Sequence, residues 1–283
     1  MSSITIRREY VMRMHVSFSG CFVILGMAVC FSTVDASDAD KESLGTTIVN
    51  TVRVSEPITY KNLSVYFLHS DRRDDRRFLT LNAALEKGLV KVTELEQEQV
   101  GRLTIENLSD EPLFLQEGDR VTGGKQDRTI YTSLIIPAKS GEQQVPTFCV
   151  EPSRWKQGKN GLAFMFNRNV GYAANNVRQA SKLLKNQGIV WQNVAQSKAQ
   201  LMQAVGNSDK TSSLNEAQDS EQVTQATQPY LESLGEAATR HQDLVGFAFV
   251  LNGEIREINI FPGQAIAAEI FPRMLETYAL EKC

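Results

Sequence analysis

The residue types that commonly bind or transform polar ligands gather between residues 111 and 155 of the chain. Glu117 and Glu151 are the two carboxylates that could act as acid and base, provided that burial shifts their pKa values. This stretch is therefore the predicted functional site. Six further residues in it could hold a ligand: Gly123, Gly124, Gln126, Arg128, Arg154 and Trp155.

These side chains favour an anionic ligand. Paired glycines let a ligand approach the backbone closely and can adopt positive φ angles. Arg128 and Arg154 can each form two hydrogen bonds to a carboxylate or phosphate, and Gln126 can both donate and accept. Trp155 could stack on a planar group. If the protein is an enzyme, hydrolysis is the favoured class, because one glutamate could activate water while the arginines hold a phosphate.

The same stretch also has a structural interpretation, which the sequence leaves open. Gly123-Gly124 is typical of a turn, and Arg128 could form a structural ion pair with either glutamate. Trp155 could belong to a hydrophobic core. Under this alternative the protein is a non-catalytic exported interaction module, and its polar residues hold the loops of a sheet together.

Several other chemistries find no support in the sequence. His15, His69 and His241 do not have the spacing of metal ligands, and Cys149 adds no close partner to them. Cys149 is therefore expected to be a small buried residue rather than a nucleophile. A Gly-x-Ser-x-Gly elbow is missing, as is a glycine-rich nucleotide fingerprint, so we expect neither a metal nor a cofactor.

Composition and charge place the chain among globular proteins. Hydrophobic residues make up 42% and charged residues 22% of the 283 residues, and the formal net charge is -3. A broad basic surface is therefore not expected, which argues against a nucleic-acid partner. The mature surface is not expected to bind anionic lipid either, so membrane contact would come only from an uncleaved N-terminal segment.

The first residues have the organisation of an export signal. Three arginines within the first 13 residues precede an uncharged stretch from residue 16 to 34. Cleavage is predicted after Ala36, which gives a periplasmic or secreted protein. A retained membrane anchor is the alternative, because the apolar run is nearly long enough to span a bilayer. The predicted organisation is a signal peptide at 1–36, a linker at 37–45 and a single domain at 46–283.

Two cysteines remain after the predicted cleavage, Cys149 and Cys283. An oxidising compartment would permit a disulfide between them. A buried Cys149 and a free terminal thiol form the favoured alternative, because Cys283 is the last residue of the chain.

The first half of the mature chain is rich in short β segments separated by turn signals. This pattern suggests an antiparallel sandwich or a partial barrel. One helix is predicted at 78–86, and Gly88 ends it. The predicted strands lie at 46–54, 58–69, 89–95, 102–108, 113–116, 129–136 and 145–150.

The second half is mainly helical and ends in a hairpin and a helix. Asn252-Gly253 stands between two β-rich runs, 244–251 and 254–261, and is the strongest short hairpin signal. The order of strands, helices, hairpin and helix predicts an α+β fold. Helices are predicted at 175–185, 189–205, 230–240 and 264–281, and a loop with weak helix at 207–228.

Motifs along most of the mature chain resemble one known family. They are Pro112-Leu113-Phe114-Leu115 after a turn at Asn107, Glu117-Gly118, the run from Gly123 to Arg128, and Cys149-Val150-Glu151 leading to Arg154-Trp155, with further matches at 81–94, 187–191 and 245–278. The chain thereby resembles the ARG-and-Rhodanese-Phosphatase-superfamily-associated protein (ARPP) domain family. Its name refers to association with ADP-ribosylglycohydrolases.

The resemblance implies a role connected with ADP-ribose, NAD or a related nucleotide. An ADP-ribose-like nucleotide is accordingly the expected ligand. Asp127 departs from the family pattern, which has an asparagine before the arginine. This departure puts in doubt any role that needs a neutral amide at that position.

Overall fold

The structure, a computed structural model, describes residues 52–71, 74, 76–95, 101–152, 165–204 and 221–281. The predicted signal peptide and linker, together with Arg154, Trp155 and Cys283, lie outside the described residues. Among the residues it describes, no helix is both long and apolar enough to cross a membrane.

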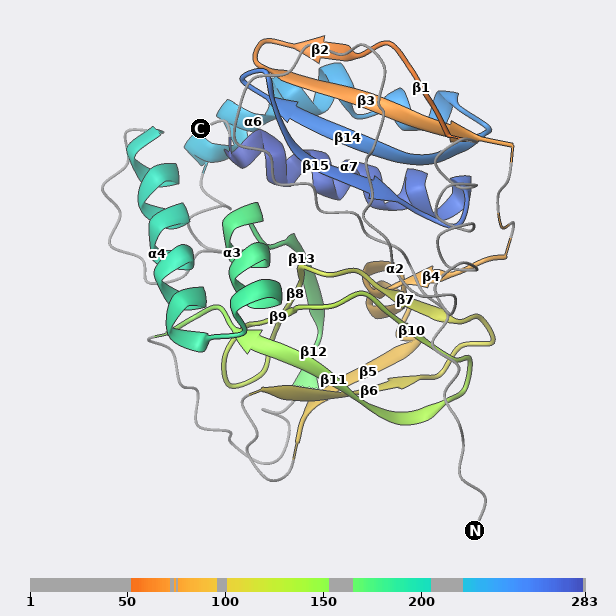
Figure 1. Ribbon diagram of the computed structural model, residues 1–283. Coiled ribbons are helices and arrows are strands. Elements are labelled where there is room, and N and C mark those ends of the chain that lie inside the picture. The colour runs from red at the N-terminus through yellow and green to blue at the C-terminus, as the bar shows by residue number, and fades with distance from the viewer. Residues whose placement is uncertain are drawn as a thin grey trace, which may run out of the picture.

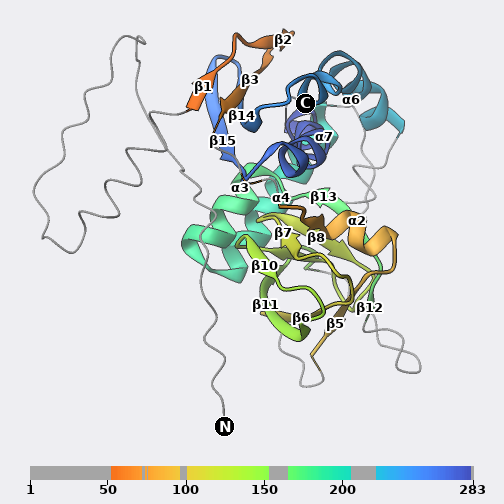
Figure 2. The same cartoon turned by 90° about the vertical axis from the view of Figure 1, so that its right-hand side faces the viewer.

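The described chain forms two β structures that we call the sheet lobe and the barrel lobe (Figure 1). The sheet lobe is a five-stranded sheet covered on one side by two helices, α6 (Glu221–Leu234) and α7 (Gln264–Glu281). Figure 2 shows α7 beside this sheet, with the barrel lobe below both. The strands of the sheet are β1 (Val52–Val54), β2 (Ile58–Tyr60), β3 (Leu63–Ser70), β14 (Leu244–Leu251) and β15 (Glu254–Ile260).

Two hairpins build the sheet lobe. Asn252 and Gly253 both have positive φ angles, 55° and 81°, and join β14 to β15, so the predicted hairpin is confirmed. The prediction of one strand over 58–69 is wrong. Lys61 adopts a φ of 51°, which reverses the chain, and β2 then pairs antiparallel with β3.

Aromatic side chains fill the space between the sheet and α7. Phe271 of α7 lies 5.3 Å from Phe67, 5.2 Å from Phe247 and 5.9 Å from Phe249, measured between ring centroids. All four rings are buried. They explain why the apolar residues of α7 recur along one face, since that face contacts the sheet.

The barrel lobe contains a seven-stranded antiparallel sheet that almost closes on itself. The strands at the two ends of its order, β12 (Met165–Phe166) and β13 (Arg168–Tyr172), are separated by one residue in the chain. The predicted partial barrel and the α+β fold class are thus confirmed. Between these ends lie β5 (Val90–Glu94), β6 (Arg102–Asn107), β11 (Gly141–Cys149), β9 (Arg128–Ile130) and β8 (Asp119–Thr122).

Among the described residues, a small second sheet and four helical segments complete the barrel lobe. The sheet orders β10 (Leu134–Ile136), β7 (Leu113–Leu115) and β4 (Leu79–Thr80), and its β4–β7 pair is parallel. Thr80 caps α2 (Leu81–Glu86), which therefore begins later than predicted. Beside the barrel lie α3 (Asn175–Gln179), the π-helix η2 (Ala180–Leu184) and α4 (Gln187–Ala204).

Other sequence-based boundaries also differ from the structure. The predicted strand at 129–136 is wrong, because β9 and β10 belong to different sheets. The strand predicted at 145–150 begins earlier, at Gly141, and ends at Cys149. Residues 221–228 of the predicted weakly helical loop belong to α6, while 207–220 lie outside the described residues. The helix predicted at 230–240 ends at Leu234 and continues as the short η3 (Ala237–Arg240).

Candidate functional site

The interior of the barrel is apolar at one end and polar at the other. Side chains alternate along a strand, and in β11 the buried positions include Val145, Thr147 and Cys149. Arg128 of β9 is the register partner of Cys149, and its side chain is only 1% exposed. The guanidinium group of Arg128 is therefore buried at this end of the barrel.

Four residues at this polar end form one hydrogen-bonded group, which we call the arginine network: Glu94, Gln126, Arg128 and Cys149. Nη2 of Arg128 lies 3.3 Å from each carboxylate oxygen of Glu94. Nη1 of Arg128 lies 2.6 Å from Sγ of Cys149 and 3.3 Å from Oε1 of Gln126. Nε2 of Gln126 donates to the carbonyl oxygen of Glu151 at 3.0 Å. The network therefore contains Gln126, Arg128 and Cys149, which the sequence analysis considered. It also contains Glu94, which the sequence analysis did not consider.

Cys149 is a donor within the arginine network. Its Sγ donates to Oε1 of Gln126 at 3.1 Å. Burial raises the pKa of the thiol to about 11, although the positive charge of Arg128 opposes this shift. The side chain of Gln187 bonds both the N–H and the C=O of Cys149, at 2.9 and 2.7 Å. A protonated, fixed thiol agrees with the expected buried Cys149 and not with a nucleophile.

The paired glycines allow a close approach of the neighbouring strand. Gly123 has a φ of 124°, and a Cβ on it would lie 2.9 Å from the carbonyl oxygen of Met165. A Cβ on Gly124 would lie 2.3 Å from the ring of Phe166. In the structure β12 approaches both glycines closely, and their predicted role in ligand binding stays a prediction.

Gly124→Ala is expected to lower the free energy of unfolding by about 1–3 kcal/mol, because the added methyl group overlaps the Phe166 ring. Chemical denaturation of the full chain measures the change. Gly101→Ala is the matched control, since a Cβ there meets nothing within 4 Å. Equal stability of the two variants would contradict the steric role of Gly124.

The turn formed by Glu117, Gly118 and Asp119 connects the barrel to its surroundings. A carboxylate oxygen of Glu117 pairs with Nζ of Lys182, on the π-helix, at 2.9 Å. Gly118 has a φ of 91°, and a Cβ there would lie 2.3 Å from Cδ of Arg178. Asp119 accepts hydrogen bonds from Nδ2 of Asn169 and from a backbone N–H. This turn thus positions helices and strands that come from distant parts of the chain.

The two predicted catalytic glutamates have different neighbours. Glu117 forms an ion pair with Lys182 of the π-helix. The backbone carbonyl of Glu151 instead accepts a hydrogen bond from Gln126 at the polar end of the barrel. Both carboxylates are buried, with 1% and 2% of their surfaces exposed. Arg154 and Trp155 lie outside the described residues, so their predicted contribution to the site stays a prediction.

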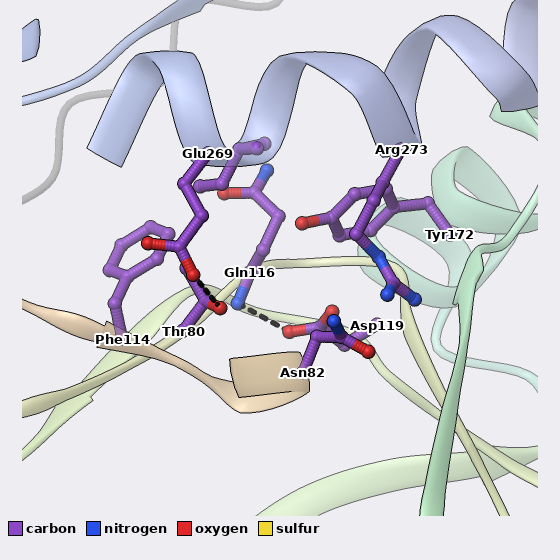
Figure 3. Close-up of a pocket in the computed structure, with 9 residues that line it drawn as sticks. Thr80, Asn82, Phe114, Gln116, Asp119, Tyr172, Glu269 and Arg273 are labelled. Carbon is purple, nitrogen blue, oxygen red and sulfur yellow. Dashed lines mark hydrogen bonds between the residues drawn. The ribbon is translucent and has the colours of Figure 1, made fainter. Parts of the chain in front are cut away.

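A small polar cavity between α7 and the barrel lobe was not predicted (Figure 3). Its volume of about 10 Å³ is room for one water molecule. Figure 3 shows Glu269 and Arg273 projecting from α7 toward the barrel lobe, where Thr80 donates to Glu269 at 2.6 Å. Arg273 donates to the backbone and side chain of Asn169 at 3.1 and 2.7 Å. The complete lining is Thr80, Asn82, Phe114, Gln116, Asp119, Tyr172, Glu269, Ile270 and Arg273.

Sequence patterns gave little indication of this cavity. Glu269 and Arg273 are four residues apart on α7, a spacing that puts both on one side of the helix, but their partners lie more than 100 positions earlier in the chain.

The cavity predicts a specific dependence of stability on pH. Burial raises the pKa of Asp119 from 3.8 to about 6, although Asn169, Gln116 and Arg273 lower it. The folded state therefore binds this proton more tightly than the unfolded state. We expect the contribution of Asp119 to stability to fall, by up to about 3 kcal/mol, as the pH rises from 4 to 6, and to stay constant above that.

Urea denaturation of the wild type and of Asp119→Asn between pH 4 and 7.5 tests this expectation. The stability of the wild type relative to the variant should be greatest at the acid end. Asp74→Asn is the control, because its hydrogen bond with Arg76 lowers the pKa of Asp74 below 3.8. Its contribution to stability is lost only at lower pH, so its difference from the wild type should change little between pH 4 and 7.5. A difference between wild type and Asp119→Asn that does not change with pH would contradict the expectation.

These observations define the class of protein: an α+β domain whose nearly closed barrel ends in a buried arginine network. The chain belongs to the ARG and Rhodanese-Phosphatase-superfamily-associated Protein domain family, which matches residues 51–283. The resemblance found in the sequence motifs is thereby confirmed. Comparisons with curated proteins and with solved structures found no match.

Proposed function

We propose that this chain is an exported domain that binds an anionic, nucleotide-like ligand at the polar end of its barrel. ADP-ribose or a related nucleotide is the first candidate, on the basis of the family name. The N-terminal sequence supports export. Phosphate groups of such a ligand would bind Arg128, since a guanidinium group can donate two parallel hydrogen bonds to a phosphate.

One observation carries this proposal. Among the described residues, Nε of Arg128 has no hydrogen-bond partner although the atom is buried. A buried donor without an acceptor is unfavourable, and a ligand oxygen would satisfy it. Gln126 lies beside the guanidinium group and presents an amide to the same region. The two residues together supply both charge and directional hydrogen bonding.

Hydrolysis is the reaction class that we propose if the ligand is turned over. Of the two predicted carboxylates, Glu151 is the better placed to activate water, because its backbone is held by Gln126 of the arginine network. Glu117 contacts Lys182 instead. In such an enzyme Glu151→Gln would abolish turnover and leave ligand binding unchanged.

Ligand binding to the full chain is testable by thermal shift and calorimetry with ADP-ribose, NAD, AMP and pyrophosphate. We expect a rise in Tm with at least one of these compounds, because binding to the folded state stabilises it. Arg128→Lys should weaken binding at least about tenfold, since lysine keeps the charge and loses the two-pronged geometry. Arg256→Lys, on the exposed part of the sheet lobe, is the matched control and should bind normally.

A second candidate function is a non-catalytic exported interaction module. It is favoured by the burial of the predicted site, since Glu117, Gln126, Arg128 and Glu151 are each at most 6% exposed. In that case Arg128→Lys would lower Tm while none of the four compounds shifts it. A variant that folds normally and loses a ligand response would instead exclude the purely structural role.

A further inference from the structure

We propose that Glu94 is an internal counterion that an anionic ligand displaces from Arg128. This inference rests on the ligand-binding function proposed above, and it adds a residue that decides which ligands enter. In the structure the carboxylate of Glu94 forms an ion pair with Nη2 of Arg128. A ligand phosphate would take that position together with the neighbouring Nε donor.

The geometry of the Glu94–Arg128 pair is that of an exchangeable contact. One nitrogen, Nη2, lies 3.3 Å from both carboxylate oxygens, so the pair does not form two parallel hydrogen bonds. The buried pair of Arg178 and Glu257 in the same protein does form them, at 3.0 and 2.5 Å. Charge-assisted hydrogen bonds are strongest at about 2.7–2.9 Å. Arg128 is therefore held less tightly by its carboxylate than Arg178 is.

The position of Glu94 also suits displacement. It is the last residue of β5, and its side chain is 7% exposed while that of Arg128 is 1% exposed. One oxygen of Glu94 also accepts the backbone N–H of Lys125 at 3.3 Å, another long contact. Moving Glu94 toward solvent would open the Nη2 and Nε edge of Arg128 without moving Gln126 or Cys149, which contact Nη1.

A ligand that displaces the counterion of Arg128 must itself be negatively charged. A buried guanidinium group needs an anion beside it, so only a ligand that brings its own negative charge can replace Glu94. Two oxygens on one phosphorus or carboxyl carbon match the Nη2 and Nε edge of Arg128. Neutral sugars would leave the buried charge uncompensated. The site would thus accept phosphate esters and pyrophosphates and exclude neutral sugars.

The experiment compares the wild-type chain with Glu94→Gln, using pyrophosphate and ADP-ribose as probes and ribose as the neutral control. Without ligand, Glu94→Gln should have a lower Tm, because Arg128 loses its counterion. With either anionic probe, it should bind at least about tenfold more tightly than the wild type, and ribose should bind to neither. A merely structural role of Glu94 would lower Tm and would not strengthen binding.

Glu94→Asp keeps the inference testable if Glu94→Gln does not fold. Aspartate retains the charge but is one methylene shorter, so the Tm loss should be small and the gain in affinity intermediate. Anion binding that depends on Arg128 and is equal in the wild type and both variants would overturn the displacement role alone. Absence of anion binding in all of them would overturn the ligand-binding proposal as well.

Discussion

Replacement of Arg178 by methionine is expected to lower the free energy of unfolding by about 3–5 kcal/mol. Arg178 lies in α3 and forms two parallel hydrogen bonds with Glu257 of β15, and both side chains are almost completely buried. Tyr278 of α7 joins them through its hydroxyl group. The variant would leave a carboxylate buried without its cation, at the point where the two lobes meet. Urea denaturation of the full chain measures the loss.

Two further variants show whether the uncompensated charge is the cause. Arg256→Met removes an exposed arginine one position from Glu257 and should change stability by less than about 0.5 kcal/mol. Arg178→Met combined with Glu257→Leu removes both charges, and should be less destabilised than Arg178→Met alone. A double variant that is less stable than the single one would show that Glu257 stabilises the fold without Arg178, through its hydrogen bond with Tyr278, and that its buried charge is not the cause of the loss.

The second large effect is expected from Phe271→Ala, which should lower the free energy of unfolding by about 3–5 kcal/mol. The Phe271 ring is fully buried and contacts three other phenylalanine rings of the sheet lobe. Its removal would leave a cavity that these rings can fill only in part. Thermal and urea denaturation would both report the loss.

Two control variants distinguish the effect of the lost side-chain volume from the effect of its buried position. Phe271→Leu fills part of the space and should cost much less than alanine. Ile255→Ala removes an apolar side chain that is 61% exposed and should have little effect. A similar loss for Ile255→Ala and Phe271→Ala would show that the packing around α7 is not the main source of stability.

Elements with long or unambiguous patterns could be predicted from the sequence. β14 and α7 have the predicted bounds, and β15 ends only one residue early, because a turn with two positive φ angles and a long apolar stripe are local properties. Short strands could not be predicted in this way. β12 and β13 contain two and five residues, and they owe their conformation to pairing across the barrel. Gly123 and Gly124 indicate that another part of the chain comes close, but they do not indicate that this part is β12.

The residue types of the site could be predicted from the sequence, but the ion-pair partner of Arg128 could not. Gln126, Arg128 and Cys149 lie close together as the motif spacing suggested, since β9 and β11 are neighbours. Glu94 was missed because it ends an ordinary-looking strand more than 30 positions earlier. Whether Arg128 pairs with Glu117 or Glu151 could not be decided from spacing, and within the described part of the chain the ion-pair partner of Arg128 is Glu94.

The sheet lobe contains both the earliest and the last described strands of the chain. β3 pairs with β14, and His69 contacts Asp243 across 174 positions of sequence. Contacts of such high sequence separation are slow to form, because a long loop must close first. The barrel strands lie between residues 90 and 172 and have much nearer partners. During synthesis the barrel can therefore fold early, while β3 cannot pair with β14 until residues 244–251 have been made.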